Sequence, residues 1–362
     1  MKKRIIISVT SDLSTDQRVR KVARSCFENG YEVQLIGRQL KGSLPLKLPY
    51  PHYRMKLIFR RSALFYAEFN IRLFFILLFS RSDILLSNDT DTLLANYLAA
   101  RIRRKKLVFD AHELFPEVPE LVDRPKVKYI WEKLESWIFP HLTHSYTACN
   151  SFSNYYKNKY NIHMEVIRNV PYYRQWKDKK IKIGFPNKKV ILYQGALNIG
   201  RGLEWVLEAM PHIRNGILVI IGDGDIRQKL KDQTKTLHIE EKVVFMGKIE
   251  AERLHEYTPS ATIGLCLLEK KGLSYYYALP NRIFDYLQTG VPILATRFPE
   301  ITNIVETHNT GVLIDHYEPQ YLAEVINNML EFPLNTEHFE SIAKELCWEK
   351  EEKVLMEIIN TI

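Results

Sequence analysis

The sequence has few of the features that mark several common classes of protein. Its four cysteines are scattered over 362 residues without a metal-binding spacing, which favours reduced thiols in a cytoplasm. Only 15 glycines and 16 prolines accompany a hydrophobic content of 46%, which excludes a fibrous or disordered chain. The longest apolar run, 73–79, lies between two arginines and is far shorter than the roughly 20 residues that cross a bilayer, so we expect no membrane span. The apolar run at the N-terminus is too short for a signal peptide and predicts a first strand.

Short apolar runs alternate with amphipathic segments along the whole chain. Strands are predicted at 4–9, 32–36, 55–59, 83–87, 106–110, 144–148, 164–167, 190–194, 218–221, 243–245, 263–268, 293–296 and 312–314. This alternation predicts an α/β protein with two doubly wound, Rossmann-like domains. The predicted parts are a first domain at 1–171, a linker at 172–187, a second domain at 188–346 and a C-terminal helix at 347–362. Two such domains that face one another would leave a cleft at the carboxyl ends of their strands, where ligands bind.

Two segments of the second domain have the pattern of an anion-binding site. A helix is predicted to start near Asn281, after a buried strand, and its N-terminus would favour a phosphate. Asp285, one turn later, could accept hydrogen bonds from sugar hydroxyls; the alternative is an ordinary βαβ unit in which Asp285 is solvated. In the segment 194–203, Gly195 and Gly202 flank a loop between a strand and a helix, and Arg201 supplies a permanent cation.

These two segments carry a resemblance to a known family. The run Leu-Pro-Asn-Arg-Ile-Phe-Asp-Tyr-Leu at 279–287, followed by Gly-Val-Pro at 290–292, resembles the nucleotide-sugar-binding segment of the family-4 retaining glycosyltransferases. The resemblance extends in order over nearly the whole chain. The sequence departs from the family at Tyr277, where the first of two paired glutamates is expected, at Asp285, which replaces the second, and at Ala196, which replaces a cation.

The resemblance implies the GT-B fold, with the last helix crossing back to the first domain. It also implies transfer of a sugar, with retention of configuration, from a UDP- or GDP-linked donor to a glycan or lipid-linked acceptor, without a metal or other cofactor. The residues it points to are Arg201 and His112 for catalysis; Gly195, Gly202, Gly222, Asp223, Leu279, Asn281, Arg282 and Asp285 for donor binding; and Asp16, Arg18 and Glu113 on the acceptor side.

Three of these residues also have plainer explanations. His112 directly follows a predicted strand and could bond a sugar hydroxyl, although a structural histidine has the same spacing. Asp16 is a plausible N-cap for a helix that ends near residue 29. Arg18 lies in the first turn of that helix, where a cation is unfavourable, which hints at an anion nearby; an exposed arginine is the alternative.

The string Asn-Asp-Thr-Asp at 88–91 could suggest a metal site. Because it follows a strand and precedes a helical pattern at 93–100, we interpret it as an N-cap with acidic first-turn residues.

The net charge of +9 predicts an anionic partner. Basic and aromatic residues are mixed at 47–81, which suits an anionic membrane surface or single-stranded nucleic acid. No nucleic-acid motif accompanies them, so nucleic acid is not expected. The plainer explanation is a helix at 63–79 that covers the sheet with its arginines in water.

The predicted function is therefore that of a cytoplasmic glycosyltransferase, associated with the inner face of the membrane, that transfers a hexosyl or N-acetylhexosaminyl group in cell-surface polysaccharide biosynthesis. The alternatives are a nucleotide-sugar epimerase on the same scaffold and a non-catalytic subunit that binds nucleotide sugar.

Overall fold

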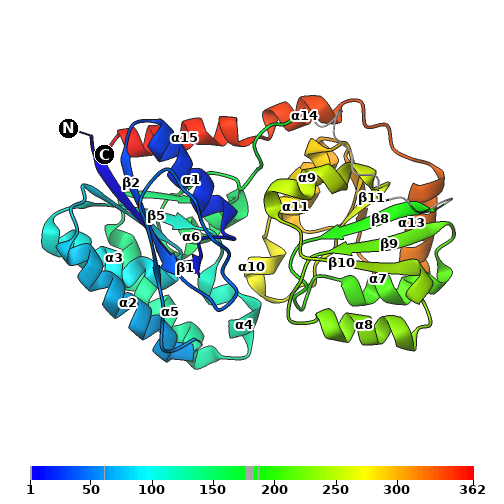
Figure 1. The fold of residues 1–362 in the computed structure, drawn as a ribbon, viewed down its shortest axis with the longest axis horizontal. Helices are drawn as coiled ribbons and strands as arrows, with labels where there is room; N and C mark the ends of the chain where they lie inside the picture. Colours follow the sequence, from blue (N-terminus) through cyan, green and yellow to red (C-terminus); the bar gives the residue numbers. More distant parts are fainter. Residues whose placement is uncertain (1, 61, 176–182, 184, 186–187) are drawn as a thin grey trace. The chain divides into compact units, whose positions relative to one another are not determined.

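The computed structural model describes residues 2–60, 62–175, 183, 185 and 188–362 (Figure 1). They form two compact units: unit 1 consists of residues 1–169 and 351–362, and unit 2 of residues 170–350. Most of the predicted linker at 172–187 lies outside the described residues.

Unit 1 is built on a seven-stranded parallel sheet in the order β3-β2-β1-β4-β5-β6-β7. Its strands are β1 (Arg4–Asp12), β2 (Glu32–Arg38), β3 (His52–Met55), β4 (Ile84–Asn88), β5 (Lys106–Ala111), β6 (His144–Thr147) and β7 (Glu165–Val166). The predicted strand at 55–59 is wrong, because the edge strand ends at Met55. The N–H groups of Ile58 and Phe59 donate instead to the carboxylate of Glu68, at 3.0 and 2.9 Å, and so cannot extend the sheet.

The helices of unit 1 are α1 (Gln17–Glu28), α2 (Ser62–Phe79), α3 (Thr90–Arg103), α4 (Pro119–Val122), α5 (Pro125–Ile138) and α6 (Asn150–Tyr160). Most of the last helix, α15 (Trp348–Asn360), also belongs to this unit. Glu351 of α15 accepts hydrogen bonds from the backbone N–H and side chain of Arg168, and Asn360 accepts one from the hydroxyl of Tyr31. These bonds tie the C-terminal helix to the first half of the chain.

Unit 2 contains a six-stranded parallel sheet in the order β10-β9-β8-β11-β12-β13. Its strands are β8 (Lys189–Gln194), β9 (Gly216–Ile221), β10 (Val243–Gly247), β11 (Ile263–Cys266), β12 (Ile293–Thr296) and β13 (Gly311–Ile314). Its helices are α7 (Leu203–Ala209), α8 (Arg227–Thr236), α9 (Ala251–Tyr257), α10 (Gly272–Tyr276), α11 (Asn281–Gln288), α12 (Pro299–Thr307), α13 (Pro319–Glu331) and α14 (Phe339–Glu345).

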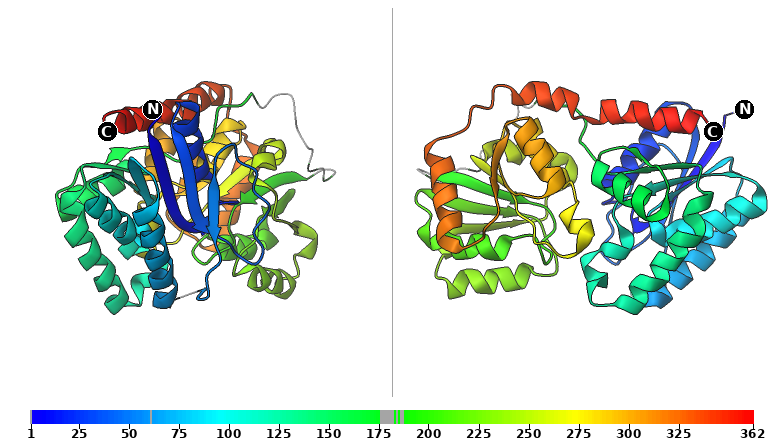
Figure 2. Two further views of the ribbon diagram at one scale, coloured as in Figure 1. Left: turned by 60° about the vertical axis from the view of Figure 1, so that its left-hand side comes forward. Right: turned by 180° about the vertical axis from the view of Figure 1, so that it is seen from behind.

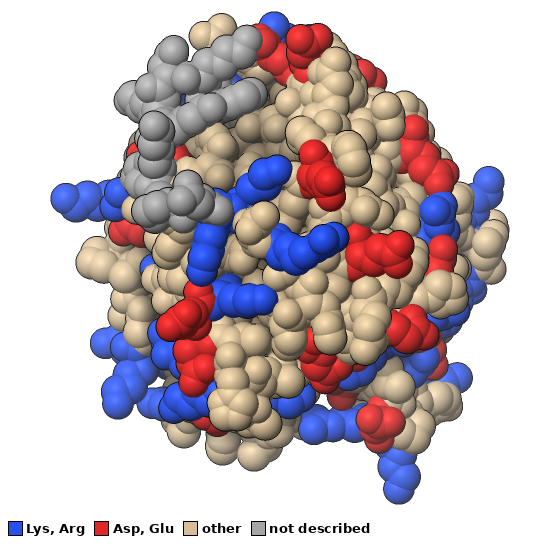
Figure 3. Space-filling model, turned by 90° about the vertical axis from the view of Figure 1, so that its right-hand side faces the viewer, with Lys and Arg blue, Asp and Glu red and all other residues tan. Residues whose placement is uncertain are grey.

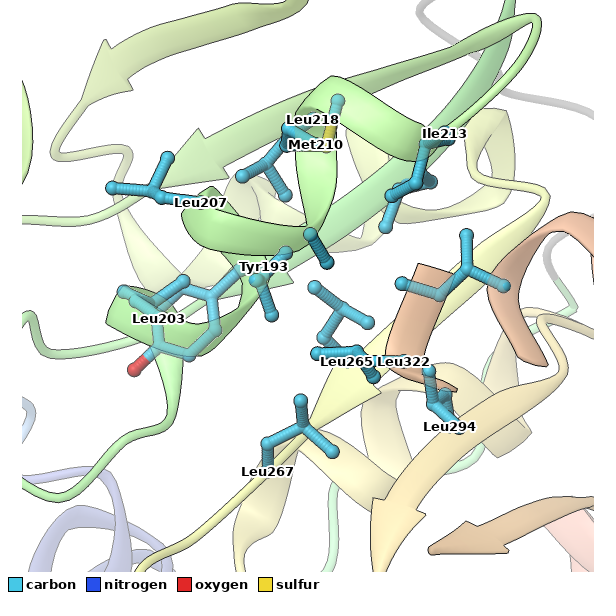
Figure 4. Close-up of a cluster of buried hydrophobic side chains, with 14 of the residues drawn as sticks. Tyr193, Leu203, Leu207, Met210, Ile213, Leu218, Leu265, Leu267, Leu294 and Leu322 are labelled. Atoms are coloured by element: carbon cyan, nitrogen blue, oxygen red, sulfur yellow. The ribbon is translucent and has the colours of Figure 1, made fainter. Parts of the chain in front are cut away.

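The sheet of unit 2 is buried on both faces. One face packs with α7 and α13 in a core that includes Tyr193, Leu207 and Leu322 (Figure 4). The other packs with α11 and α12 through residues such as Phe284 and Ile301. Near-continuous apolar strands are what two-sided burial requires, because no face is left for polar residues. The predicted α/β fold with two Rossmann-like domains is confirmed.

Candidate functional site

In unit 1, the candidate residues gather at the carboxyl ends of β4 and β5. The two strands are neighbours, with Asn88 opposite Asp110, so the residues that follow them meet at one edge of the sheet. His112 Nε2 lies 3.0 Å from Asp110 Oδ2 and 3.1 Å from Asn88 Oδ1, and His112 Nδ1 lies 3.3 Å from Asp89 Oδ2. Each ring nitrogen therefore has a carboxylate beside it.

These two carboxylates decide the charge of His112. Burial alone would lower the pKa of the imidazole, but Asp110 and Asp89 outweigh it and raise this pKa to about 9. His112 is consequently an imidazolium at neutral pH, and it has no free basic nitrogen with which to remove a proton from a substrate.

Arg18 is not exposed to solvent; it lies beside an anion, as the sequence hinted, and this anion is the protein's own Asp110 carboxylate. Its side chain is only 3% exposed; Nε and Nη2 donate to the Asp110 carboxylate, and Nη1 donates to the carbonyl of Ile167 at 2.7 Å. Burial alone would raise the pKa of Asp110, but Arg18 and His112 outweigh it and lower this pKa to about 2. Arg18 thus positions Asp110, and through it His112.

The two other residues predicted on the acceptor side differ in their surroundings. Asp16 is the predicted N-cap of α1: its Oδ1 accepts the N–H of Val19 at 3.0 Å, and its Oδ2 accepts the hydroxyl of Ser11 at 2.6 Å. Glu113 follows His112, and burial, with the charge of Asp89, raises its pKa to about 8. Asp16 therefore has a structural task, whereas Glu113 is a carboxyl group that stays largely protonated at neutral pH.

Asp89 is a residue of this cluster whose task the sequence reasoning missed. It precedes α3, as expected of an N-cap, but its side chain caps nothing: Oδ1 accepts the backbone N–H of His112 at 2.8 Å. Its backbone has φ 57° and ψ 165°, a combination that is rare outside glycine and persists only where the surroundings enforce it. The adjacency of β4 and β5 was the signal that could have brought Asp89 and His112 together.

In unit 2, the loops after β8 and β9 are held against each other by their backbones. The N–H of Gly195 donates to the carbonyl of Ile221 at 2.9 Å, and the N–H of Leu197 donates to that of Asp223 at 3.0 Å. A Cβ at Gly222 would lie 1.8 Å from the carbonyl oxygen of Gly195, so only glycine fits there. The predicted glycines of the donor site thus bring two loops into close contact.

Two arginines lie by these loops, and each has a buried N–H group without a hydrogen-bond partner among the described residues. Arg282, at the start of α11, is 7% exposed; its guanidinium lies 4.4 Å from the ring centre of Tyr193, and its Nη1 is unpartnered. Arg201 lies 4.7 Å from the ring centre of Tyr275, and its Nε is unpartnered. Both guanidinium groups are close enough to Cys266 to act on the pKa of its thiol, so they belong to one neighbourhood.

The other predicted donor residues surround the same region. α11 begins at Asn281, as predicted, and Asn281 is exposed. Asp285 Oδ2 accepts a hydrogen bond from Gln194 Nε2 at 2.9 Å, and Gln194 in turn accepts one from Thr258 at 2.8 Å, so Asp285 is held by its neighbours rather than merely solvated.

The remaining three predicted residues have mainly local tasks. Gly202, with φ 70°, precedes α7, and a Cβ there would lie 2.6 Å from the Cβ of Leu267. Asp223 accepts the N–H of Gly224 at 3.0 Å, and Leu279 packs against the unit 2 core.

Within the part of the chain that the structure describes, no three His, Cys, Asp or Glu side chains are grouped so that they could hold a metal ion. This includes the string at 88–91, where Asp91 Oδ2 accepts a hydrogen bond from Thr10 at 2.5 Å.

Two family models match the chain, one for each half. Residues 16–171 match the model described as Glycosyltransferase Family 4, and residues 174–346 match the model described as Glycosyl transferases group 1. Together they span nearly the whole chain.

Curated relatives match over a shorter stretch. An uncharacterized glycosyltransferase of Methanocaldococcus jannaschii is 26% identical over 167 residues, which is 45% of this chain and 41% of the relative. The alpha-monoglucosyldiacylglycerol synthase of Streptococcus pneumoniae is 24% identical over 45% of this chain and 36% of its own length. The matched stretch thus spans about two fifths of these relatives.

Solved structures match over 99% of this chain. Sucrose-phosphate synthase from Thermosynechococcus elongatus has a TM-score of 0.81 at 16% identity over 99% of its chain. HepE from Anabaena, in complex with UDP-glucose, has a TM-score of 0.71 at 15% identity over 100% of its chain. At these identities the likeness shows the fold.

Proposed function

Because the chain belongs to the glycosyltransferases that the two family models describe, we propose that it transfers a sugar from a nucleoside diphosphate sugar to a glycan or lipid-linked acceptor. The observation that carries this proposal is the pair of arginines by the glycine loops of unit 2. Buried N–H donors without partners are uncommon, because each costs free energy until a ligand or water satisfies it. An anion with several oxygens, such as a diphosphate, would satisfy both guanidinium groups.

In the proposed reaction, the bond between the anomeric carbon and the diphosphate oxygen breaks, and a bond to the acceptor oxygen forms. The leaving diphosphate gains negative charge, which Arg201, Arg282 and the N-terminus of α11 would stabilise as it develops. The proton of the acceptor hydroxyl passes to the departing phosphate, so no protein nucleophile, general base or metal ion is needed. We propose that the configuration is retained and that the transferred group is a hexosyl or N-acetylhexosaminyl group.

One departure from the family pattern, Ala196, fits this assignment. Ala196 leaves a cation missing from the loop after β8, and the guanidinium of Arg282 lies beside that loop: its Nη2 is 3.4 Å from the position of a Cβ at Gly195. We propose that Arg282 supplies the charge that Ala196 lacks. His112, fixed as an imidazolium, would act on the substrate by its charge rather than as a base. That the two units face each other across a cleft stays a prediction.

Several observations support a UDP-sugar donor, a lipid-linked acceptor and a cytoplasmic location. The structural neighbour from Anabaena binds UDP-glucose, and the relative from S. pneumoniae is named for a product that contains diacylglycerol. All four cysteines are free and buried, as suits a reducing compartment. We place the activity in the synthesis of cell-surface polysaccharide, at the inner face of the membrane.

The test is a thermal-unfolding panel with UDP, GDP and their hexose and N-acetylhexosamine conjugates, on wild type, Arg201→Ala and Lys229→Ala. A ligand at about 100 times its Kd should stabilise the wild type by about 2.7 kcal/mol. Lys229, which is 66% exposed, serves as a control and its variant should respond like wild type. Stabilisation by one base that Arg201→Ala loses supports the donor site; no stabilisation at millimolar nucleotide contradicts it. If nucleotide sugar stabilises the protein but no tested acceptor leads to release of nucleoside diphosphate, the chain would instead be the non-catalytic binding subunit.

A further inference from the structure

Helix α2 has a mostly apolar outer face, in which the ion pair of Glu68 and Arg72 is set. Phe65, Phe69, Leu73 and Leu77 are buried, 0 to 5% exposed, and the last three pack in a core with residues of the sheet. On the opposite side, a second apolar stripe at helical spacing is exposed to solvent. It comprises Leu64 (55%), Ile71 (59%), Phe75 (53%) and Phe79 (81%). A surface helix usually carries charged or polar residues there, so this stripe needs an explanation.

The helix is long and apolar enough to cross a membrane, which counting the run 73–79 alone did not reveal. Over its 18 residues the mean hydropathy is 1.6, and 22% of them are buried. However, Phe69, Leu73 and Leu77 are completely buried in the core that β1 and β4 share with α3. To cross a bilayer, α2 would have to leave the sheet and expose that core, whereas α2 in place on the sheet can lie along a membrane surface with its outer stripe immersed.

Two more helices of unit 1, which contact α2 or each other, also carry exposed apolar side chains. Tyr66 of α2 contacts Trp131 of α5 with ring centres 5.1 Å apart, and Tyr97 of α3 contacts Trp137 of α5 at 5.5 Å. Both views of Figure 2 show α2 and α5 along the same side of the unit. Three further apolar side chains are exposed on these neighbouring helices: Ile102 (61%) on α3, and Ile130 (64%) and Trp137 (50%) on α5. We call the surface formed by Ile71, Phe75, Phe79, Ile102, Ile130 and Trp137 the outer apolar face.

Arginines gather at one end of the outer apolar face. Helices that connect parallel strands run opposite to them, so the carboxyl ends of α2 and α3 share one edge of the sheet. Arg81 follows the first of these ends, and the exposed Arg101 and Arg104 lie at the second. The exposed acid nearest in sequence, Asp83, is already paired with Lys105. By contrast, the face shown in Figure 3 has acidic and basic side chains interspersed.

We propose that the outer apolar face is the surface through which this protein binds an anionic lipid bilayer. Its aliphatic and phenylalanine side chains would enter the acyl region, Trp137 suits the interfacial zone, and the arginines would meet the lipid phosphates. A second copy of the chain fits less well. The six residues that define the outer apolar face include no acid that could pair with the arginines of the other copy.

Vesicle co-sedimentation tests this proposal on the full chain without nucleotide sugar, so its outcome is separate from that of the proposed transfer. The probes are vesicles of phosphatidylcholine alone and with 30% phosphatidylglycerol, on the order of a natural anionic fraction. Wild type should bind the anionic vesicles and not the neutral ones. Phe75→Glu with Phe79→Glu should weaken binding at least about tenfold, since each change removes an inserted ring and adds a repelled charge. Phe332→Glu, at a side chain of unit 2 that is 71% exposed, is the matched control and should bind like wild type.

Three results would overturn the proposal. The first is binding by the double variant equal to that of wild type, with circular dichroism showing that both are folded. The second is a wild type that does not bind anionic vesicles. The third is a wild type that forms a dimer in analytical ultracentrifugation which the double variant loses. A dimer of that kind would assign the outer apolar face to a second copy. The charge is tested separately with Arg81→Ser, Arg101→Ser and Arg104→Ser combined, which should lose anionic-vesicle binding while the apolar residues remain intact.

Discussion

The buried arginines of the two units have opposite surroundings. In unit 1, Arg18 donates to Asp110 through two nitrogens and to the carbonyl of Ile167 through the third. In unit 2, Arg282 is nearly as buried, but its Nη1 has no partner among the described residues. A buried cation with every donor satisfied belongs to the scaffold, because its charge is already neutralised. In the proposed function, the free donor of Arg282 would bind an oxygen of the diphosphate.

This difference separates two effects of mutation. Removing a partner of Arg18 should cost stability, whereas removing Arg282 should cost ligand binding and turnover while leaving stability nearly intact.

The largest effect on stability is expected from Asp110→Asn. It leaves the guanidinium of Arg18 buried without its counter-charge, which typically costs about 3–5 kcal/mol. Urea unfolding monitored by circular dichroism measures this loss. Asp83→Asn is the matched control, because Asp83 is 51% exposed and its pairing with Lys105 should contribute no more than about 1 kcal/mol. Equal losses of unfolding free energy in the two variants would mean that burial of the Arg18–Asp110 pair does not contribute to stability.

Arg282→Met should show the opposite behaviour. It removes the proposed diphosphate contact and should lower kcat by about 100- to 1,000-fold, as the loss of a donor to developing charge usually does. Its free energy of unfolding should stay within about 1 kcal/mol of that of wild type, since a buried charge is replaced by an apolar chain of similar length. The assay measures release of nucleoside diphosphate from the nucleoside diphosphate sugar. An Arg282→Met variant that is unstable yet fully active would show that Arg282, like Arg18, stabilises the fold and does not bind the donor.

The sequence predicted most of the fold because local patterns determine it. Apolar runs marked both sheets, Asp16 marked the start of α1, and α11 begins at Asn281 as expected. The edge strand β3 was misplaced, because the apolar pattern did not reveal that Glu68 captures the N–H groups of residues 58 and 59. The partners of Arg18 and His112 could not be predicted from the sequence, for another reason. Asp110 lies 92 residues from Arg18, and Asp89 lies 23 from His112, so only the strand order brings them together.

His112→Gln tests the charge of the unit 1 cluster through pH. The folded protein raises the pKa of His112 from its ordinary value of 6.5 to about 9, so folding favours the protonated form. The stabilisation that the protonated His112 provides is therefore full below pH 6.5 and is lost as the pH rises through about 9. The difference in free energy of unfolding between wild type and the variant should be up to about 3 kcal/mol larger at pH 6 than at pH 10. Parallel unfolding curves of the two proteins across that range would show that the imidazole is not held charged.

The smallest expected effect on ligand binding is that of Gly195→Ala, which tests the surroundings of the Arg282 guanidinium directly. Gly195 has φ 136°, which a side chain adopts at a cost of about 1–3 kcal/mol, and the new Cβ would lie 3.4 Å from Arg282 Nη2. Gly247→Ala also places a side chain at positive φ, 74°, but a Cβ there has nothing within 4 Å. Both variants should therefore lose some stability in urea unfolding. Only Gly195→Ala should weaken nucleoside diphosphate binding in calorimetry, by a few fold, because only there would the new methyl group contact the guanidinium of Arg282. Equal affinities in the two variants would place the diphosphate away from Arg282 and leave its free donor to a different ligand.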